Sequence, residues 1–357
     1  MLLCRLFKAA AWLCLAFQLT WATAYFLTGS GLLHLVAVTP TYLSMANWLA
    51  VYLFIPLPAV LLVAGLCRSR QLLTGFLVAG SVFLAVWGWQ YSPSRWPAQL
   101  AKSQSTETHR LKVMTYNVLA WHNRTSHIIQ TIQHEDADIV FLQELNPLQA
   151  RALQDRLSQE YPYQQLKPSS DDPGGSGLLS KYPLEPARAD LPHTRWVGEP
   201  LAAKMKWGAG QVLLVNFHMA SSTRFASWQA MKEDFKARNE QASLLVEYAR
   251  SSADSPLGVI AAGDMNSVPL SDAYRLMTST FQDAWAQTGF GLGNTFPGNN
   301  INNSPKPHLG FFFMPSWIVH LDYIFYTSPW NALASHTAQA DGASDHRGVV
   351  AELINLP

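Results

Sequence analysis

The sequence predicts an α/β domain, in which two β-sheets pack together with helices outside, preceded by three transmembrane helices. Three observations lead to this prediction. The chain of 357 residues is 49% hydrophobic and only 14% charged, against a usual charged share of about 25%. That deficit is concentrated in the N-terminal part, where the first acidic residue is Glu107. From Leu111 onward, short apolar strands alternate with amphipathic helices.

Three N-terminal stretches lack charged residues and are long enough to cross a bilayer. They are residues 9–27, 47–66 and 72–89. A spanning helix needs about 20 apolar residues, with a lower limit of roughly 17. Pro56 and Pro58 fall in the second stretch, but neighbouring helices accommodate prolines inside a membrane. The alternatives are a buried helical hairpin and a cleaved signal peptide that ends near residues 22–24.

The basic residues beside these stretches predict their orientation. Arg5 and Lys8 precede the first stretch, and Arg68 and Arg70 separate the second from the third. Basic flanks remain on the cytoplasmic side, so three spans place everything after Tyr91 outside the cytoplasm. In a Gram-negative bacterium this predicts a multi-pass inner-membrane protein with a periplasmic domain.

The chain therefore divides into a membrane domain, a linker and a catalytic domain. These are residues 1–91, 92–109 and 110–357, and the linker is polar with two prolines. Beyond residue 100 there are 20 Lys and Arg residues against 24 Asp and Glu residues. This balance weighs against long nucleic acid as the main substrate, because proteins that bind many phosphates usually present a basic face. All three cysteines lie in the membrane domain and do not indicate the compartment.

Alternating strand and helix patterns run through the catalytic domain. Helices are predicted around Ile128, Ile129 and Ile132, at 147–160 and at 231–250. Strands are predicted at 111–118, 137–145, 176–183, 202–207, 211–220, 257–266, 320–326 and 348–354. Strand pairs mixed with helices indicate two packed sheets with helices outside.

Polar residues capable of phosphate chemistry cluster at the ends of these strands. They are Asn117, Glu144, His218, Asp264, Asn266, Asp322, Asp345 and His346. Strand ends can converge at one rim of a sheet sandwich. A hard cation prefers carboxylate oxygens and neutralises charge that develops on a phosphoryl oxygen. A His paired with an Asp can take a proton from water. Each of these residues alone would have an ordinary structural explanation, and the set predicts a metal-dependent phosphodiesterase.

The motifs around these residues resemble the endonuclease/exonuclease/phosphatase superfamily, with its membrane-tethered bacterial branch the nearest likeness. The matching strings are TYNV at 115–118, LQEL at 142–145, NFHMAS at 216–221, GDMNS at 263–267, HLDYIF at 320–325 and SDH at 344–346. They occur in the family's order and cover residues 110–357. The resemblance implies a four-layer α/β/β/α sandwich that uses Mg²⁺, with Mn²⁺ as the alternative.

The resemblance also implies a role for each residue. Glu144 is the expected principal metal ligand, with Asn117 beside it and Asp345 near the metal. Asp264 would position or activate the attacking water, and Asn266 would hold the phosphate. His346 would bind the phosphoryl group or transfer a proton, oriented by Asp322. His218 would donate to the transition-state oxygens, and a satisfied core histidine is its alternative.

Three positions depart from the family pattern or remain ambiguous. Asn117 is followed by Val118, Leu119 and Ala120, where some nucleases carry an acidic residue, so one principal metal is a safer expectation than two. His320 stands where an Arg is common, and either a phosphate contact or a strand position would explain it. Asp283 falls in a family segment, and we expect it to be structural.

The predicted substrate is a phospholipid or another membrane-derived phosphodiester. Residues 309–318, LGFFFMPSWI, are intensely apolar just before Asp322. They form either an edge strand or core, or a surface that dips into lipid beside the site. The alternatives to a lipid hydrolase are an extracytoplasmic DNA nuclease and a catalytically inactive binding or sensing module. The predicted partners are the bilayer and the diester, and nothing indicates an obligate protein partner.

Overall fold

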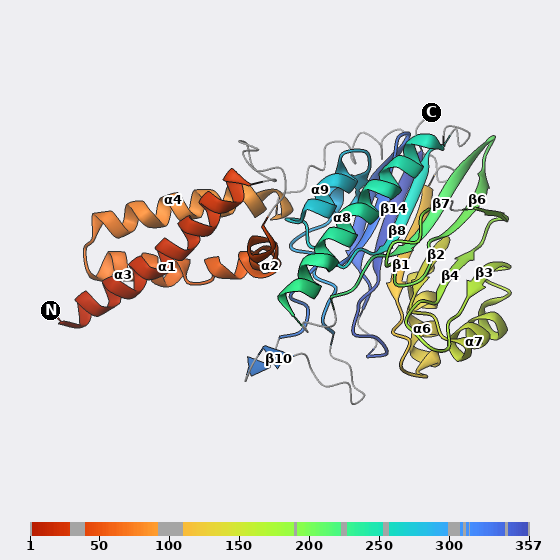
Figure 1. Ribbon diagram of the computed structural model, residues 1–357, viewed down its shortest axis with the longest axis horizontal. Helices are drawn as coiled ribbons and strands as arrows, with labels where there is room; N and C mark the ends of the chain where they lie inside the picture. Colours follow the sequence, from red (N-terminus) through yellow and green to blue (C-terminus); the bar gives the residue numbers. More distant parts are fainter. Residues whose placement is uncertain are drawn as a thin grey trace.

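The computed structural model describes most of the chain, with the predicted linker at 92–109 among the segments outside it. The described ranges are 2–28, 40–91, 110–188, 191–222, 227–252, 257–298, 308–309, 312–313, 315–339 and 342–355. A bundle of apolar helices lies at one end of the molecule, and a two-sheet domain lies at the other (Figure 1).

The N-terminal helices pack through small and aromatic side chains. The elements are α1 (Leu2–Leu27), α2 (Thr41–Leu49), η1 (Ala50–Phe54), α3 (Leu57–Leu66), α4 (Arg70–Trp87) and η2 (Gly88–Tyr91). Trp21 stacks on Trp87 with ring centroids 5.4 Å apart, and Phe54 packs edge-on against both. A disulfide between Cys4 and Cys67 joins the start of α1 to the end of α3. The buried aromatic cluster therefore holds these helices together as one bundle.

Two of the three predicted spans are single long helices. Among the described residues, Leu2–Leu27 and Arg70–Tyr91 are long and apolar enough to cross a membrane. The second predicted span is instead broken into Thr41–Phe54 and Leu57–Leu66, which meet at an angle of 43°. The break falls at Pro56, which lacks a backbone N–H, and α3 begins directly after it. A third crossing therefore depends on whether this bent pair spans the bilayer as a unit, and it remains a prediction.

The C-terminal domain contains two six-stranded sheets within the described residues. In spatial order, the first sheet is β13 (Trp330–Thr337), β14 (Val349–Asn355), β1 (Arg110–Asn117), β2 (Ile139–Gln143), β4 (Ser176–Ser180) and β3 (Tyr163–Lys167). The second is β5 (Leu184–Ala187), β6 (Leu201–Trp207), β7 (Gly210–His218), β8 (Val259–Asp264), β12 (Asp322–Tyr326) and β9 (Gln282–Asp283). A short hairpin, β10 (His308–Leu309) with β11 (Phe312–Phe313), stands apart.

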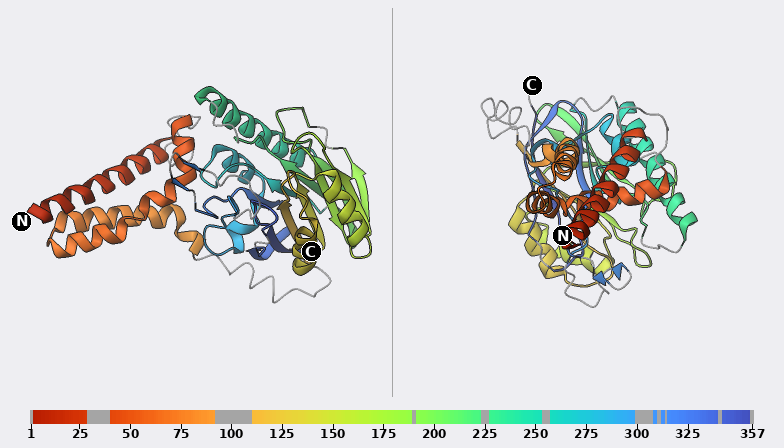
Figure 2. Two further views of the ribbon diagram at one scale, coloured as in Figure 1. Left: turned by 90° about the horizontal axis from the view of Figure 1, so that it is seen from below. Right: turned by 90° about the vertical axis from the view of Figure 1, so that its left-hand side faces the viewer.

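Three hydrophobic clusters arrange these elements in four layers. The central cluster, which includes Phe141 and Leu214, lies between the two sheets. Helices α6 (Thr125–Glu135) and α7 (Pro147–Leu157) cover the outer face of the first sheet through a second cluster. Helices α8 (Trp228–Ser251) and α9 (Asp272–Thr278) cover the second sheet through a third, and Figure 2 shows the two helical layers on opposite sides. The predicted α/β two-sheet sandwich is therefore confirmed.

Strand register brings the polar strand ends together at one rim. In the first sheet β1 runs parallel to β2, and Asn117 pairs with Gln143. In the second sheet β7 runs parallel to β8, and His218 pairs with Asp264. Strand β12 is antiparallel to β8, so that Asp322, at its start, also pairs with Asp264. Parallel strands end at the same edge, which explains how residues more than 200 positions apart share one site.

Candidate active site

Asn117 joins the two sheets at the centre of the site. It is completely buried at the end of β1. Its side-chain nitrogen donates to Glu144 Oε1 and to Asp264 Oδ2, both at 3.1 Å. Its side-chain oxygen accepts from the Leu119 amide at 3.1 Å. One amide therefore fixes two carboxylates from different sheets beside each other.

Backbone geometry at two site residues lies in the left-handed region. Glu144 has φ +58° and Asn266 has φ +48°. Such conformations cost about 1–3 kcal/mol at non-glycine residues and persist only where their surroundings enforce them. Here the Glu144 carboxylate accepts from the Ala120 amide, and Asn266 donates from its side chain to Met219 O. The strain places both side chains at the rim rather than along their strands.

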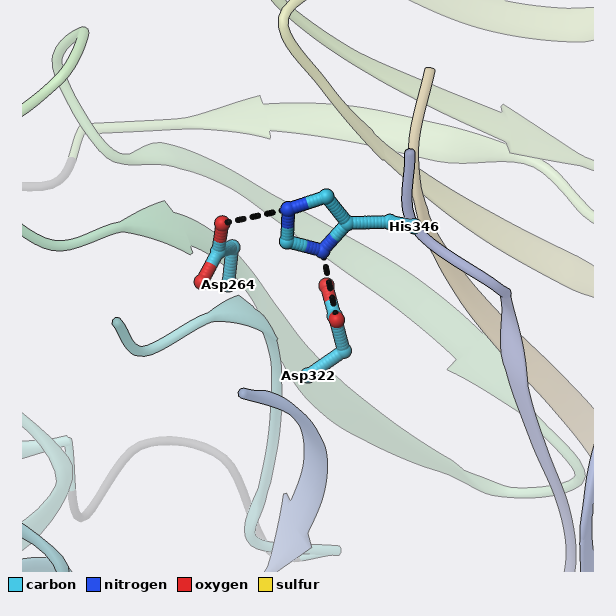
Figure 3. A group of neighbouring side chains, drawn as sticks. All are labelled: Asp264, Asp322 and His346. Atoms are coloured by element: carbon cyan, nitrogen blue, oxygen red, sulfur yellow. Dashed lines mark hydrogen bonds and ion pairs between the residues drawn. The ribbon is translucent and has the colours of Figure 1, made fainter. Parts of the chain in front are cut away.

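His346 lies between two buried aspartates (Figure 3). Its Nδ1 is 2.8 Å from Asp322 Oδ2, and its Nε2 is 3.7 Å from Asp264 Oδ2. Burial alone would lower the pKa of His346, but Asp322 and Asp264 raise it well above its ordinary value. The two aspartates therefore favour the cationic imidazole. Asp322 orients the ring through its hydrogen bond with Nδ1, and Asp264 lies within ion-pair distance of Nε2.

Asp264 contacts side chains and backbone from several segments of the site. Its Oδ1 accepts from the Asn266 amide at 2.8 Å, and its Oδ2 is 3.3 Å from His218 Nε2. Burial alone would raise the pKa of Asp264, but His346, His218 and the Asn266 amide lower it to about 2. Asp264 is thus an anion at any physiological pH, although it is 1% exposed.

His218 completes this charged group. Burial alone would lower its pKa, but its hydrogen bond with Asp264 and the nearby Glu144 raise it. Its Nδ1 has no hydrogen-bond partner among the described residues. A buried nitrogen without a partner is unusual in a folded protein. Contact with a phosphoryl group therefore remains a prediction for His218, which is 5% exposed.

Acidic residues at the open side of the rim are suited to a divalent cation. Glu144 is only half-buried. Burial raises the pKa of Asp345 to about 6, where Glu144 and Asp264 add to the shift and His346 opposes it. A carboxylate whose ionisation is disfavoured by neighbouring acids is stabilised by a cation beside it, and oxygen ligands suit Mg²⁺. These residues therefore fit the expected metal through Glu144 and Asp345, with the Asn117 amide beside them.

A second group of side chains has spacing compatible with an ion. One ligand atom from each of Asp264, Asp322 and His346 lies within 4.8 Å of the others. Both ring nitrogens of His346 already face carboxylate oxygens, however, and the two aspartates raise its pKa, which favours the protonated ring. A protonated imidazole has no lone pair for a metal, so this group is better suited to proton transfer than to metal ligation.

The two ambiguous residues are structural in the folded protein. His320 is buried, stacks on Tyr323 at 4.4 Å and places both ring nitrogens near backbone carbonyls. It fills a strand position and does not face the rim. Asp283 accepts from the Trp285 amide at the start of α10 (Ala284–Thr288) and from the Tyr274 hydroxyl.

Sequence reasoning did not assign several residues that support the site. Ser344 donates to Asn117 O at 2.7 Å and accepts from the His346 amide at 3.0 Å. Its position two residues before His346, in the SDH string, could have indicated this role. Phe296 packs 4.9 Å from the His346 ring, and Arg347 lies over Trp317 at 4.4 Å. Trp317 lies in the apolar stretch 309–318 that drew attention in the sequence, whereas the sequence around Arg347 gives no comparable signal for its contact with Trp317.

Comparisons with known proteins concern the family and the fold of this domain. Residues 114–346 match the model of the Endonuclease/Exonuclease/phosphatase family, over more than half of the chain. None of the curated proteins matches the chain by sequence.

Three solved structures illustrate the shared fold. An endonuclease/exonuclease/phosphatase from Bacteroides vulgatus superposes with a TM-score of 0.53 at 21% identity, over 69% of this chain and 99% of that one. TDP2 from Caenorhabditis elegans, as selenomethionine protein, gives 0.53 at 16% identity, over 78% and 89%. A truncated TDP2 from the same organism gives 0.51 at 17% identity, over 69% and 98%. At these identities the similarity shows the fold alone.

Proposed function

Because this chain belongs to the endonuclease/exonuclease/phosphatase family, we propose that it is a membrane-anchored, Mg²⁺-dependent phosphodiesterase that faces outside the cytoplasm. Members of this family are phosphoester hydrolases and generally use divalent metal ions. The observation that carries the proposal is the buried Asp322–His346–Asp264 group beside the half-buried Glu144. A binding module would not need a protonated histidine held between two aspartates.

The side chains divide the work of hydrolysis between them. The ionised Asp264 is a hydrogen-bond acceptor, and its pKa of about 2 suits it to orienting the attacking water rather than to removing its proton. The protonated His346, fixed by Asp322, can donate to a phosphoryl or leaving oxygen. His218 Nδ1 and Asn266 offer further donors to the phosphate. This arrangement would hold the attacking water in line with the bond between phosphorus and the leaving oxygen.

The metal would be held by Glu144 and Asp345 at the open side of the rim. When bound, a Mg²⁺ ion neutralises charge on the phosphoryl oxygens and supplies Lewis acidity. Asn117 orients Glu144 through its amide nitrogen, so its contribution is to fix the carboxylate that binds the ion. We expect one principal metal, because Val118 and Leu119 follow Asn117 where a second acid would stand.

A membrane-derived diester, such as a phospholipid, is the proposed substrate. Two apolar helices are long enough to anchor the protein, and the rim loops lie against the end of the bundle (Figure 1). Trp317 adds an aromatic surface beside His346 through its contact with Arg347. Phe311, in the apolar stretch before it, lies outside the described residues. The domain beyond residue 100 also lacks a basic surplus that would favour long nucleic acid.

The substrate class can be tested with the full chain in nanodiscs. Phospholipid vesicles, plasmid DNA and a soluble chromogenic diester are supplied with Mg²⁺, and release of product is measured. We expect Mg²⁺-dependent turnover of lipid and of the soluble diester, and a loss of about 10²-fold or more in Glu144→Gln. Faster cleavage of DNA than of lipid would overturn the lipid proposal, and no turnover of any diester would favour a binding module.

The orientation depends on how often the bundle crosses the bilayer. Helices α1 and α4 both end beside the catalytic domain, whereas α1 begins and α3 meets α4 at the opposite end (Figure 1). The chain therefore runs the length of the bundle three times, which supports an extracytoplasmic catalytic domain. Protease added to intact spheroplasts should remove this domain without lysis. Protection of the domain until the cells are lysed would contradict the orientation.

A further inference from the structure

The end of the helical bundle is seated on the loops that flank the active site. Asn47, on α2, is 4% exposed and donates to Leu270 O at 3.0 Å. Leu270 lies four residues beyond Asn266, so this bond reaches the loop that leaves the catalytic strand β8. Trp48 and Leu49 pack against buried apolar side chains from both flanks of the rim, namely Val268, Val319 and Leu321. The membrane domain therefore contacts the segments just after Asn266 and just before Asp322.

Tyr52, on η1, makes the polar contact with the second of these flanks. Its hydroxyl donates to Ile318 O at 2.8 Å and accepts from the Asn294 side chain at 3.1 Å. The same Asn294 nitrogen also donates to Trp317 O at 2.8 Å. One tyrosine from the membrane domain thus joins two catalytic-domain segments that are separated by more than 20 residues.

The turn held by Tyr52 is strained. Trp317 has φ +61°, a left-handed conformation that is rare for a bulky side chain. Such a residue stays in place only where neighbouring contacts over-determine it. The hydrogen bonds to Trp317 O and Ile318 O are contacts of this kind, and one of them comes from η1.

The same segments lie directly beside the catalytic histidine. The Arg347 guanidinium donates to Asn294 O, and the Arg347 amide donates to Thr295 O. Arg347 follows His346 in the chain and stacks over Trp317. Phe296 packs against the His346 ring. A shift of residues 294–296 would therefore move Phe296, which packs against the His346 ring, and also the backbone beside His346, through the Arg347 amide.

We propose that Tyr52 is a positioning residue. Through it, the membrane domain fixes the two segments that meet at Asn294 and Trp317, and these segments in turn set the orientation of His346. This inference rests on the proposed phosphodiesterase function for its kinetic consequence. Catalysis, and not only location at the bilayer, then depends on the docked membrane domain. A diester is hydrolysed efficiently only where η1 is seated on the rim.

Tyr52→Phe removes the hydroxyl and keeps the ring, so it tests this link directly. In full-length protein in nanodiscs, kcat on a soluble diester should fall about three- to tenfold, as expected for loss of one or two positioning hydrogen bonds. KM for this small substrate should change little. Tyr42→Phe is the matched control, because Tyr42 is an exposed tyrosine on the adjacent helix α2, and it should retain full activity.

Two further measurements separate positioning from general destabilisation. Asn294→Ala should lower kcat at least as much as Tyr52→Phe, and the double variant should be no worse than Asn294→Ala alone, because both act through one link. Amide hydrogen exchange should become faster at residues 317–319 in Tyr52→Phe and stay unchanged at β1 and β2.

The outcomes distinguish failure of this inference from failure of the proposed function. Unchanged kcat and unchanged exchange at 317–319 in Tyr52→Phe would overturn the positioning role. Faster exchange with unchanged kcat, or additive losses in the double variant, would also overturn it. If the unmodified protein hydrolysed no diester, the proposed function would fail, and with it the catalytic role of Tyr52, whereas the exchange result would still decide whether Tyr52 holds the turn.

Discussion

Two groups of buried aspartates and histidines near β12 differ in their electrostatic properties. The rim cluster contains His346 between Asp322 and Asp264, and in the rear cluster Asp283 and His320 are linked through Tyr274 and Tyr323. At the rim, the pKa of His346 is raised, and that of Asp264 is lowered to about 2. Behind the rim, Asp283 and His320 have no counter-ion among their described hydrogen-bond partners. Burial there raises the pKa of Asp283 to about 6 and lowers that of His320 to about 4.

The difference shows that burial alone does not identify a catalytic group. His320 and Asp322 are two residues apart and are both at most 3% exposed. Desolvation favours the neutral form of each. Burial raises the pKa of Asp322, and the nearby His346 opposes that shift, whereas burial lowers the pKa of His320 without an opposite charge among its described hydrogen-bond partners. The rim cluster therefore keeps opposite charges paired, whereas in the rear cluster His320 is neutral at pH 7 and Asp283 ionises only as the pH rises through about 6.

The prediction with the largest expected effect on activity removes charge from the rim cluster. His346→Gln should lower kcat by about 10²- to 10⁴-fold, the usual contribution of a positioned acid or base. It should also lower the melting temperature, because the buried Asp322 loses its counter-ion. Turnover of a soluble diester and thermal unfolding in detergent measure the two effects.

A double variant separates the two contributions. His346→Gln with Asp322→Asn removes both charges and retains two groups that can hydrogen-bond. We expect it to recover much of the thermal stability and none of the activity. Recovery of activity in the double variant would show that the charged pair has only a structural role, and the contrast between the two clusters would be lost.

Several of the candidate site residues could be placed from sequence because they stand at the ends of recognisable strands, although Asp322 begins β12 and His346 lies in the loop before β14. Apolar strings end directly at Asn117, His218 and Asp264, and parallel pairing brings such ends to one rim. The fold could be predicted for the same reason. Strand β3, in contrast, was not predicted, because YQQLK is a half-exposed polar edge strand without apolar alternation.

The contact between the membrane domain and the rim could not be predicted from the sequence. Tyr52 and Asn294 are 242 residues apart, and both are neutral side chains without a periodic pattern. The bend at Pro56 was also missed, because a proline within an apolar stretch is compatible with either a continuous or a broken span. Such long-range contacts depend on how two domains dock, which local sequence patterns do not encode.

The test with the smallest expected effect is Asp283→Asn in the rear cluster. It should leave activity within about twofold, because the substitution keeps the hydrogen bonds of this position. Asn at position 283 can still cap α10 and contact the Tyr274 hydroxyl. The folded-state pKa of Asp283, about 6, lies above its ordinary value of 3.8. Its contribution to stability is therefore present below pH 3.8 and is lost as the pH rises through 6.

Asp283→Asn removes this titration, so its melting temperature relative to the unmodified protein should increase from pH 4 to pH 7. The shift of roughly two pKa units corresponds to a change on the order of 2–3 kcal/mol. Thermal unfolding of both proteins across this pH range measures the difference. A constant difference would mean that the folded protein does not raise the pKa of Asp283, and the proposed contrast between the rear cluster and the rim would be lost.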